Sequence, residues 1–415
     1  MENFLYKTLK KLEKYTKTDM VYLTKGGFWL ISGQIISTIL AVAFSVVVAK
    51  YLSKESFGMY KYALSIIGII SSFYLSGLGT AITRATALGI EGVLKKAIKT
   101  NFKWGVIPIL IYISVSAYYF VSGNSTFGIS FLIAAALSPF VESFELYSAY
   151  LNGKKDFKLA SLLMTFKTFF SLLLIALSGI YFGSAYVMIG AYFVSNFISN
   201  IAFYFLSIKI YKPNEKTDDG ESVSLGKHNS VVYTLASFSD QLDNILIFHY
   251  LGAAELAIYN FAVMIPNTIQ GLIKNLAILA VPKFAAQDIK KAQKSILGKT
   301  FVLFIFTIPI VILYYFLAPL VYKYLFPNYQ ESVKYTLIYI FSVLINSTVS
   351  LSFFDANYAI REKYKLGLSS NILKCILLFA GAFYWGIWGV ILARFISKLF
   401  GFIYSIILAR GFIKA

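Results

Sequence analysis

Long runs of apolar residues dominate the chain, and their lengths predict membrane-spanning helices. A helix needs about 20 apolar residues to cross roughly 30 Å of hydrocarbon. Twelve such runs lie at residues 26–49, 57–83, 102–122, 126–150, 159–182, 184–208, 228–251, 255–281, 300–321, 331–356, 366–385 and 386–409. The pattern predicts an all-α polytopic membrane protein with about 12 transmembrane helices.

Three pairs of neighbouring runs have almost no polar residue between them. The separating residues are Gly123 to Ser125, Gly183 with Ser184, and Gly386 to Gly389. An apolar stretch of about forty residues must turn once to stay in a bilayer. Because glycine adopts the backbone conformations of tight turns, we expect a helical hairpin at each position.

An internal repeat relates the two halves of the chain. Residues 51–63 return at 250–262, with identical residues at Tyr51, Leu52, Tyr60 and Ala63. A second, shorter repeat relates residues 154–159 to residues 361–366 at an offset of 207 residues, which also aligns Lys167 with Lys374. The offset of the first repeat, 199 residues, aligns Arg84 with Lys283. Such a long period indicates a duplication. We expect residues 51–63 to form a short outer turn between two helices, with Tyr60 at the membrane interface.

The polar stretch 209–227 divides the twelve runs into six and six. We therefore predict an N-terminal bundle at 26–208, a cytoplasmic linker at 209–227 and a C-terminal bundle at 228–410. Because six is even, the two bundles are parallel repeats about an axis normal to the membrane. Residues 1–25 fit either a basic amphipathic helix on the membrane surface or a solvated tail.

The distribution of basic residues predicts the orientation. With the N-terminus in the cytoplasm, the inner segments carry 28 of the 38 Lys and Arg residues. The positive-inside rule then places both termini in the cytoplasm of a multi-pass protein of the cytoplasmic (inner) membrane. The net charge of +19 is explained by anchoring to an anionic leaflet. We expect no nucleic-acid partner and a monomer.

Composition excludes a soluble domain and gives no enzymatic site. Hydrophobic residues make up 58% of the chain and charged residues only 14%, far from globular averages. The single cysteine, Cys375, cannot form an internal disulfide, and His228 and His249 lie at opposite ends of one run. No phosphate-binding glycine-rich loop is present, so we expect no enzyme, no cofactor and no metal site.

Charged residues inside the predicted spans are the candidates for function, because charge in a bilayer is costly. We expect the basic ones to line a cationic substrate cavity: Arg84, Lys167, Lys274, Lys283, Lys374 and Arg394. For Arg84 and Lys283, and for Lys61 and Lys398, snorkelling from a helix end is the alternative explanation.

Five carboxylates are candidates for ion coupling: Glu142, Glu145, Asp240, Asp243 and Asp355. The first four form two pairs spaced i, i+3, so each pair shares one helix face. Neutralising the basic residues is the alternative role. Five amides are expected to join helices by hydrogen bonds: Gln34, Asn196, Asn200, Asn275 and Asn346.

Several short motifs resemble those of the polysaccharide-biosynthesis (Wzx-type) flippases, which are related to MATE exporters and lipid II flippases within the MOP superfamily. In the first half the residues are Gly33-Gln34, Ala49 to Leu52, Phe57 to Tyr60, Ala63 to Ser65 and Gly77 to Arg84. In the second half they are Asp243 to Ile247, Leu251-Gly252 and Ile258-Tyr259.

The resemblance implies a MATE-like fold, in which two six-helix bundles open alternately to each side of the membrane. It also implies a polyprenyl-diphosphate-linked oligosaccharide, an O-antigen, capsule or exopolysaccharide repeat unit, as cargo, and glycan polymerase or ligase machinery as partners. A cationic path suits a diphosphate. The alternative is a MATE-like, cation-coupled exporter of drugs or metabolites, for which acidic walls would matter most. A scaffold or an integral transferase is a third possibility.

Overall fold

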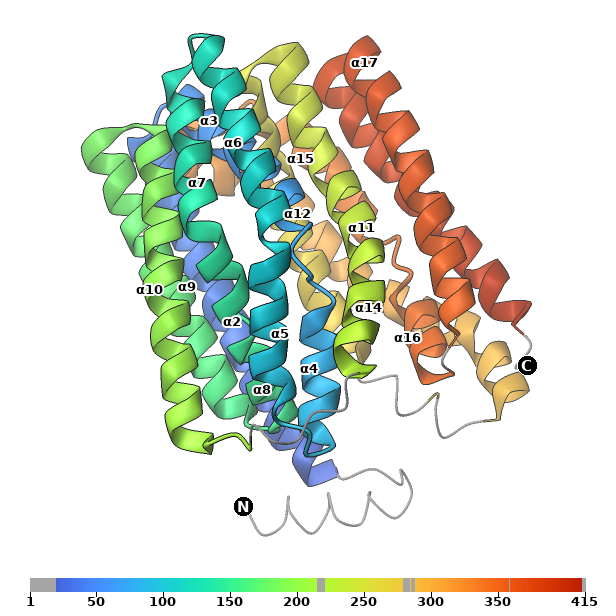
Figure 1. Cartoon of the computed structure of the whole chain (residues 1–415). Coiled ribbons are helices and arrows are strands. Elements are labelled where there is room, and N and C mark those ends of the chain that lie inside the picture. Colours follow the sequence, from blue (N-terminus) through green and yellow to red (C-terminus); the bar gives the residue numbers. More distant parts are fainter. Residues whose placement is uncertain (1–19, 215–220, 279–283, 285–287, 358, 413–415) are drawn as a thin grey trace, which may run out of the picture. The chain divides into compact units, whose positions relative to one another are not determined.

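Every element in the described part of the chain is a helix (Figure 1). The computed structural model describes residues 20–214, 221–278, 284, 288–357 and 359–412. From residue 26 onward the chain divides into two compact units, residues 26–245 and 246–415. Helices suit this apolar chain because a bilayer offers no partners for backbone N–H and C=O groups, and a helix satisfies them internally.

In its described residues the first unit contains ten helices, the last of which extends past its end. Their bounds are α2 Met20–Tyr51, α3 Lys54–Ser71, α4 Leu78–Ala87, α5 Val93–Trp104, α6 Val106–Val121, α7 Ser125–Phe144, α8 Tyr147–Gly153, α9 Phe157–Phe182, α10 Ala185–Tyr211 and α11 Glu221–Leu251. Helix α11 begins inside the stretch 209–227 expected to be a linker, and residues up to Ile245 cluster with the first unit. The division into two six-helix bundles at this stretch remains a prediction.

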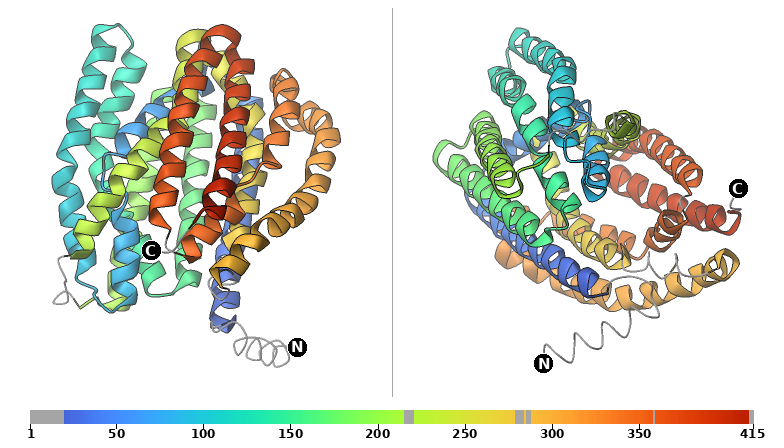
Figure 2. Two further views of the ribbon diagram at one scale, coloured as in Figure 1. Left: turned by 90° about the vertical axis from the view of Figure 1, so that its right-hand side faces the viewer. Right: turned by 60° about the horizontal axis from the view of Figure 1, so that its bottom comes forward.

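The second unit continues with longer helices. Their bounds are α12 Ala253–Ile278, α14 Ile289–Leu325, η1 Pro327–Tyr329, α15 Ser332–Tyr339, η2 Ile340–Val343, α16 Thr348–Ala356 and α17 Ile360–Arg410. Helix α17 is interrupted at Gly386 (φ 56°, ψ −134°). Its halves run antiparallel, because Gly381 lies against Gly389 and Gly401 lies against Ser370 (Figure 2).

The twelve predicted runs all correspond to helical segments. Among the described residues, nine helices are long and apolar enough to cross a membrane. One of them, α17, contains two crossings. The remaining two runs are 57–83, divided between α3 and α4, and 228–251, which lies in α11. The three predicted glycine turns are confirmed, since Gly123, Gly183 and Gly386 have φ values of 76°, 60° and 56°.

The second predicted span is not continuous, contrary to the expectation for 57–83. The chain leaves the helix after Ser71 and resumes it at Leu78. Side chains from other helices satisfy the freed backbone groups: Asn101 accepts from the Leu75 N–H at 3.0 Å, and Ser230 accepts from the Gly77 N–H at 3.0 Å. Thr234 donates to the Ser72 carbonyl at 2.8 Å. Such side-chain partners allow a non-helical segment at membrane depth.

The two copies of the internal repeat have the same local structure. Helices α3 and α12 begin at Lys54 and Ala253, which are 199 residues apart, the same offset as the sequence repeat. Tyr60 and its counterpart Tyr259 are both buried, at 4% and 1% exposure. Both rings pack inside their units, and the depth of Tyr60 in the membrane stays a prediction.

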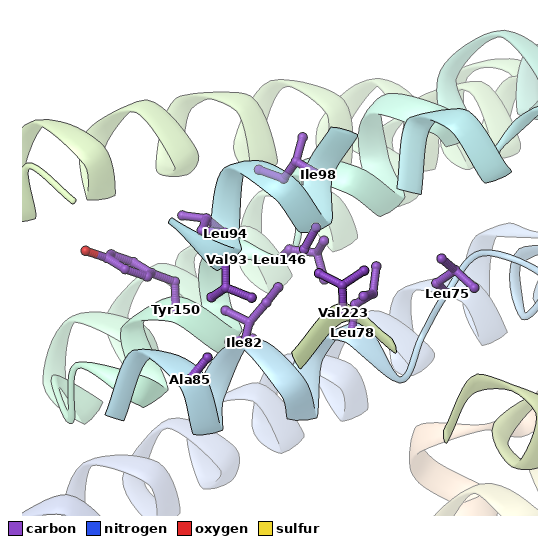
Figure 3. Packing of buried hydrophobic residues seen from close by; sticks show 12 residues of the cluster. Leu75, Leu78, Ile82, Ala85, Val93, Leu94, Ile98, Leu146, Tyr150 and Val223 are labelled. Carbon is purple, nitrogen blue, oxygen red and sulfur yellow. The ribbon is translucent and has the colours of Figure 1, made fainter. Parts of the chain in front are cut away.

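A compact apolar cluster lies beside the interrupted helix. Its buried side chains come from α4, α5, α8 and the start of α11, and include Leu78, Ile82, Val93, Tyr150 and Val223 (Figure 3). Leu75, from the interruption itself, belongs to the same cluster. The cluster thus supports one side of the non-helical segment.

Candidate functional site

The first unit contains a polar cavity of about 220 Å³ beside the interruption between α3 and α4. Glu142 on α7, Glu145 at the end of α7 and Asn101 on α5 line it together with Tyr74 and Ser148. The two glutamates are one turn apart, so both reach the same cavity. The structure therefore brings together two of the five carboxylates identified in the sequence.

Lys167 on α9 neutralises one of these glutamates. Its Nζ lies 2.7 Å from Oε1 of Glu145, with side-chain exposures of 14% for the lysine and 48% for the glutamate. A residue predicted for the cationic cavity and a residue predicted for ion coupling are thus direct partners. The contact also joins the end of α7 to α9.

Hydroxyl groups surround the second glutamate. Ser71, Glu145 and Lys167 are electrostatic or hydrogen-bonding neighbours of Glu142. The Ser71 and Tyr112 hydroxyls lie 3.0 Å apart, and Tyr112 also donates to the Ile67 carbonyl at 3.1 Å. Carboxylate and hydroxyl oxygens of this kind can hold a proton or a small cation, or accept hydrogen bonds from a hydroxylated ligand.

No metal centre is found in the part of the chain that the structure describes. Within it, no group of three or more His, Cys, Asp or Glu side chains could hold a metal ion. The polar cavity has only two carboxylates among its lining residues.

The second unit carries a cluster of opposite charge. Lys398, on the second half of α17, donates to Gln270 Oε1 at 2.9 Å, to Tyr339 Oη at 3.1 Å and to Ser342 Oγ at 3.1 Å. All three acceptors are uncharged, so they satisfy the ammonium donors without cancelling the charge. Lys274, one turn after Gln270 on α12, is among the charges that act on Lys398.

Arg394 lies one turn before Lys398 and shares its tyrosine partner. Its Nη1 donates to Tyr339 Oη at 3.2 Å, and the guanidinium lies 5.9 Å from the ring centroids of both Tyr259 and Tyr339. The Tyr339 hydroxyl in turn donates to Asn267 Oδ1 at 3.0 Å. One tyrosine hydroxyl thus connects both cations to α12.

The other basic candidates are spread over the two units. Arg84 on α4 and Lys274 on α12 are exposed, and Lys374 on α17 is half-buried. Lys283 lies outside the described residues. The structure therefore places Arg394 in the second-unit cluster, with Lys274 nearby, and pairs Lys167 with Glu145 of the first-unit cavity, while Arg84 belongs to neither.

The remaining acidic candidates do not gather at one place. Asp243 on α11 is buried, at 1% exposure, and its Oδ1 accepts from the Asn244 N–H at 2.9 Å. Asp240, one turn earlier, is exposed. Asp355 forms an ion pair with Lys363 in which both side chains are nearly half exposed. This exposed pair resembles a structural contact more than a buried coupling site.

Two of the predicted amide contacts join helices. Asn196 on α10 donates to Ser171 Oγ of α9 at 3.3 Å, and Asn200 on α10 donates to the Val141 carbonyl of α7 at 2.9 Å. Gln34 is exposed, and Asn346 accepts hydrogen bonds from Thr348 at the start of α16. The side chain of Asn275 lies outside the described residues.

Sequence analysis left Lys398 outside the predicted cationic cavity, with snorkelling as an alternative role, and did not identify Tyr339. In the structure the Lys398 ammonium is held by three side chains of its own unit. The i, i+4 spacing of Arg394 and Lys398 was a usable signal. No signal identified Tyr339, which is one of 31 tyrosines.

A further polar network lies outside the spans. Glu91, in the loop between α4 and α5, accepts from the Lys154 ammonium, from the Asn214 N–H at 3.1 Å and from the Tyr150 hydroxyl at 3.4 Å. Burial acts to raise the pKa of Glu91, but these hydrogen bonds and the lysine charge outweigh it and hold the pKa below its ordinary value.

Comparison of the sequence with family models gives one match. The model described as "Polysaccharide biosynthesis protein" matches residues 23–286. A comparison with curated protein sequences gives no match.

Solved structures share the fold of the whole chain. An inward-facing multidrug resistance MATE family transporter of the MOP superfamily superposes with a TM-score of 0.76 at 14% identity, covering 92% of this chain and 97% of the other. A MOP superfamily transporter from Pyrococcus furiosus, described as having a binding pocket of reverse polarity that suggests a different function, gives 0.67 at 12% identity, with 93% and 95% covered. The predicted all-α, MATE-like fold of about 12 spans is confirmed.

Proposed function

The chain belongs to the polysaccharide biosynthesis protein family, and from this premise we propose that it carries a polyprenyl-diphosphate-linked oligosaccharide across the membrane. The direction is from the inner to the outer leaflet of the cytoplasmic membrane, with both termini in the cytoplasm. Transport occurs by alternating access. Glycan polymerase or ligase machinery would then receive the product on the outer side.

The cationic cluster of Lys398 and Arg394 is the observation that carries this proposal. A diphosphate needs fixed positive charge, and arginine offers a planar fork of donors for phosphate oxygens while lysine offers a compact charge. The three acceptors of Lys398 are uncharged. An arriving diphosphate therefore meets an ammonium whose charge these partners do not cancel.

The groups around the two cations also suit the rest of the substrate. Tyr259 and Tyr339 present aromatic rings, and Asn267 and Gln270 present amides on the same helix, α12. Amide and hydroxyl groups exchange hydrogen bonds with sugar hydroxyls. Diphosphate and sugar can thus be held by neighbouring residues of one unit.

The test is a liposome assay with a fluorescent lipid-linked oligosaccharide, in which a membrane-impermeant reagent distinguishes the two leaflets. We expect the double variant Lys398→Ala with Arg394→Ala to lower the flipping rate about tenfold or more, because hydrogen bonds to charged groups contribute about 1.5–3 kcal/mol each. Lys323→Ala, an exposed lysine on α14, is the matched control. Wild-type flipping by the double variant would overturn the proposal.

The acidic cavity of the first unit supports a second candidate, a cation-coupled exporter of drugs or metabolites. Glu142 and Glu145 line that cavity, and carboxylates attract cationic cargo. The two functions predict different effects of Glu142→Gln in cells exposed to toxic cations. If drug export is the function, Glu142→Gln sensitises the cells and Lys398→Ala does not. Glycan transport predicts that neither variant changes sensitivity.

A further inference from the structure

An open apolar groove of about 460 Å³ lies on the first unit, next to the helix interruption that also borders the polar cavity. Its walls come from the interruption, from the end of α5 and from α11. Leu75 lines both the groove and the polar cavity. Anything that fills the groove therefore contacts the non-helical segment that borders the cavity.

The groove exposes large apolar side chains together. Phe73, Trp104, Leu235 and Phe238 are exposed by 42%, 41%, 39% and 41%. In a membrane-spanning chain such side chains suit contact with lipid hydrocarbon. Their exposure indicates an apolar occupant.

The hydroxyl groups in the groove are already engaged within the protein. Thr234 donates to the Ser72 carbonyl at 2.8 Å, Ser230 donates to the Gly226 carbonyl at 2.8 Å, and Ser72 donates to the Ile69 carbonyl at 2.6 Å. Each hydroxyl proton is therefore used. The body of the groove selects a hydrocarbon chain over a polar ligand.

A positively charged side chain, that of Lys227, lies at one end of the groove. The Lys227 ammonium lies over the Trp104 ring, 6.0 Å from its centroid, and the lysine is exposed. From Lys227 to Phe238 helix α11 rises roughly 16 Å at 1.5 Å per residue. This is about half of the roughly 30 Å of hydrocarbon in a bilayer, or one leaflet.

We infer that the groove binds one acyl chain of an anionic phospholipid from the leaflet that contains Lys227. The phosphate lies at Lys227, Trp104 lies at the interface, and the chain extends along α11 to Phe238. An acyl chain has the length of one leaflet. A polyprenyl carrier has a chain several times longer and would leave most of it outside the groove. The bound lipid supports the non-helical segment through Leu75.

Trp104 provides a direct probe of this site. In full-length protein with Trp29, Trp385 and Trp388 replaced by Phe, Trp104 is the only tryptophan. In detergent, phosphatidylglycerol with brominated acyl chains should quench its emission at concentrations about fivefold lower than brominated phosphatidylethanolamine, as expected for one lysine acting on an anionic lipid. Lys227→Glu should remove this preference.

Lys99→Glu, an exposed lysine on α5, makes the same charge change away from the groove and should keep the preference. Equal quenching by the two lipids, unchanged in Lys227→Glu, would mean ordinary contact with bulk lipid and would overturn the inference. Displacement by polyprenyl phosphate at lower concentration than by phosphatidylglycerol would also overturn it, because the groove would then belong to the substrate. Neither result depends on transport, so the proposed function is tested separately.

Discussion

Individual charged residues in this protein have two kinds of partner. Lys167 and Lys154 face carboxylates, which fixes their positions and cancels their charge. Lys398 is held by an amide and two hydroxyls, which fix its position while its charge remains. Each of these ion pairs is neutral overall, so it attracts an anionic ligand less strongly than a lysine with uncharged partners does. Lys398 is therefore better suited than Lys167 to bind an anionic group.

Glu91 gives a prediction about pH. Its pKa lies below the ordinary value of 4.5, so its interactions stabilise the folded protein fully above that value and are lost as the pH falls through the lowered pKa. We expect the thermal midpoint of the detergent-solubilised protein to fall between pH 7 and about pH 4. Glu91→Gln should show a smaller fall over the same range.

Glu55→Gln is the control, because Glu55 is exposed at the start of α3. The thermal midpoint of this variant should fall with pH by as much as that of the wild type. If Glu91→Gln and Glu55→Gln have the same pH dependence, the Glu91 network does not contribute to acid sensitivity.

The sequence could predict which residues share a helix face, but not which residues of other helices they contact. The i, i+3 spacing of Glu142 and Glu145 correctly put both on one side of a helix. Their partner Lys167 comes from a different helix, and the tyrosine that connects Lys398 to Arg394 lies 59 and 55 residues away from them. Helix periodicity carries no information about such long-range contacts.

Among the helices, glycine decides where the chain turns and how closely two helices approach. The halves of α17 are in contact at Gly381 and Gly389, where a Cβ on Gly389 would lie 1.9 Å from the Gly381 carbonyl oxygen. That distance is far below any real contact, and the obstacle is backbone. Only glycine allows this hairpin to close, as in other tightly packed membrane helices.

Gly389→Ala should therefore destabilise the protein by about 1–3 kcal/mol, the usual cost of overpacking. Thermal unfolding in detergent, followed by tryptophan emission, measures the change. Gly367→Ala on the same helix has open space around the new Cβ and should be neutral or stabilising by up to about 1 kcal/mol, because alanine favours helix. Equal midpoints for the two variants would contradict the close approach.

The glycine turns were predictable from sequence, but the interruption at residues 72–77 was not. The run 57–83 is mostly apolar and contains no proline, so a continuous helix was the expectation. The interruption is stabilised by Asn101, Ser230 and Thr234, which lie on other helices. Local propensity cannot reveal a break whose hydrogen-bond partners are distant in sequence.

At the scale of the whole molecule, the two units carry polar sites of opposite charge. The repeats share a helix boundary and a buried tyrosine, Tyr60 and Tyr259. The polar cavity of the first unit is lined by carboxylates, whereas the cluster of the second is built on Arg394 and Lys398. Opposite charges suit different ligands, so we expect the first unit to bind the coupling cation and the second to bind the substrate.

This division of roles predicts separable effects in the liposome assay. Glu142→Gln should abolish the dependence of flipping on an imposed proton or sodium gradient. The half-saturating substrate concentration should stay within about twofold of the wild-type value, because the Glu142 side chain does not contact the phosphates of the substrate. Lys398→Ala should raise the half-saturating concentration about tenfold, because a charge-assisted contact is lost. It should leave the gradient dependence intact.

Glu55→Gln again serves as the control, and it should change neither quantity. Comparing Glu142→Gln with Lys398→Ala is decisive because, in a coupled transporter, a change at one site affects the other site only through the conformational equilibrium. If that equilibrium were the only thing altered, each variant would change both quantities together. Separate changes require two distinct sites, whereas parallel changes in both variants would mean that Glu142 and Lys398 act on one shared conformational step.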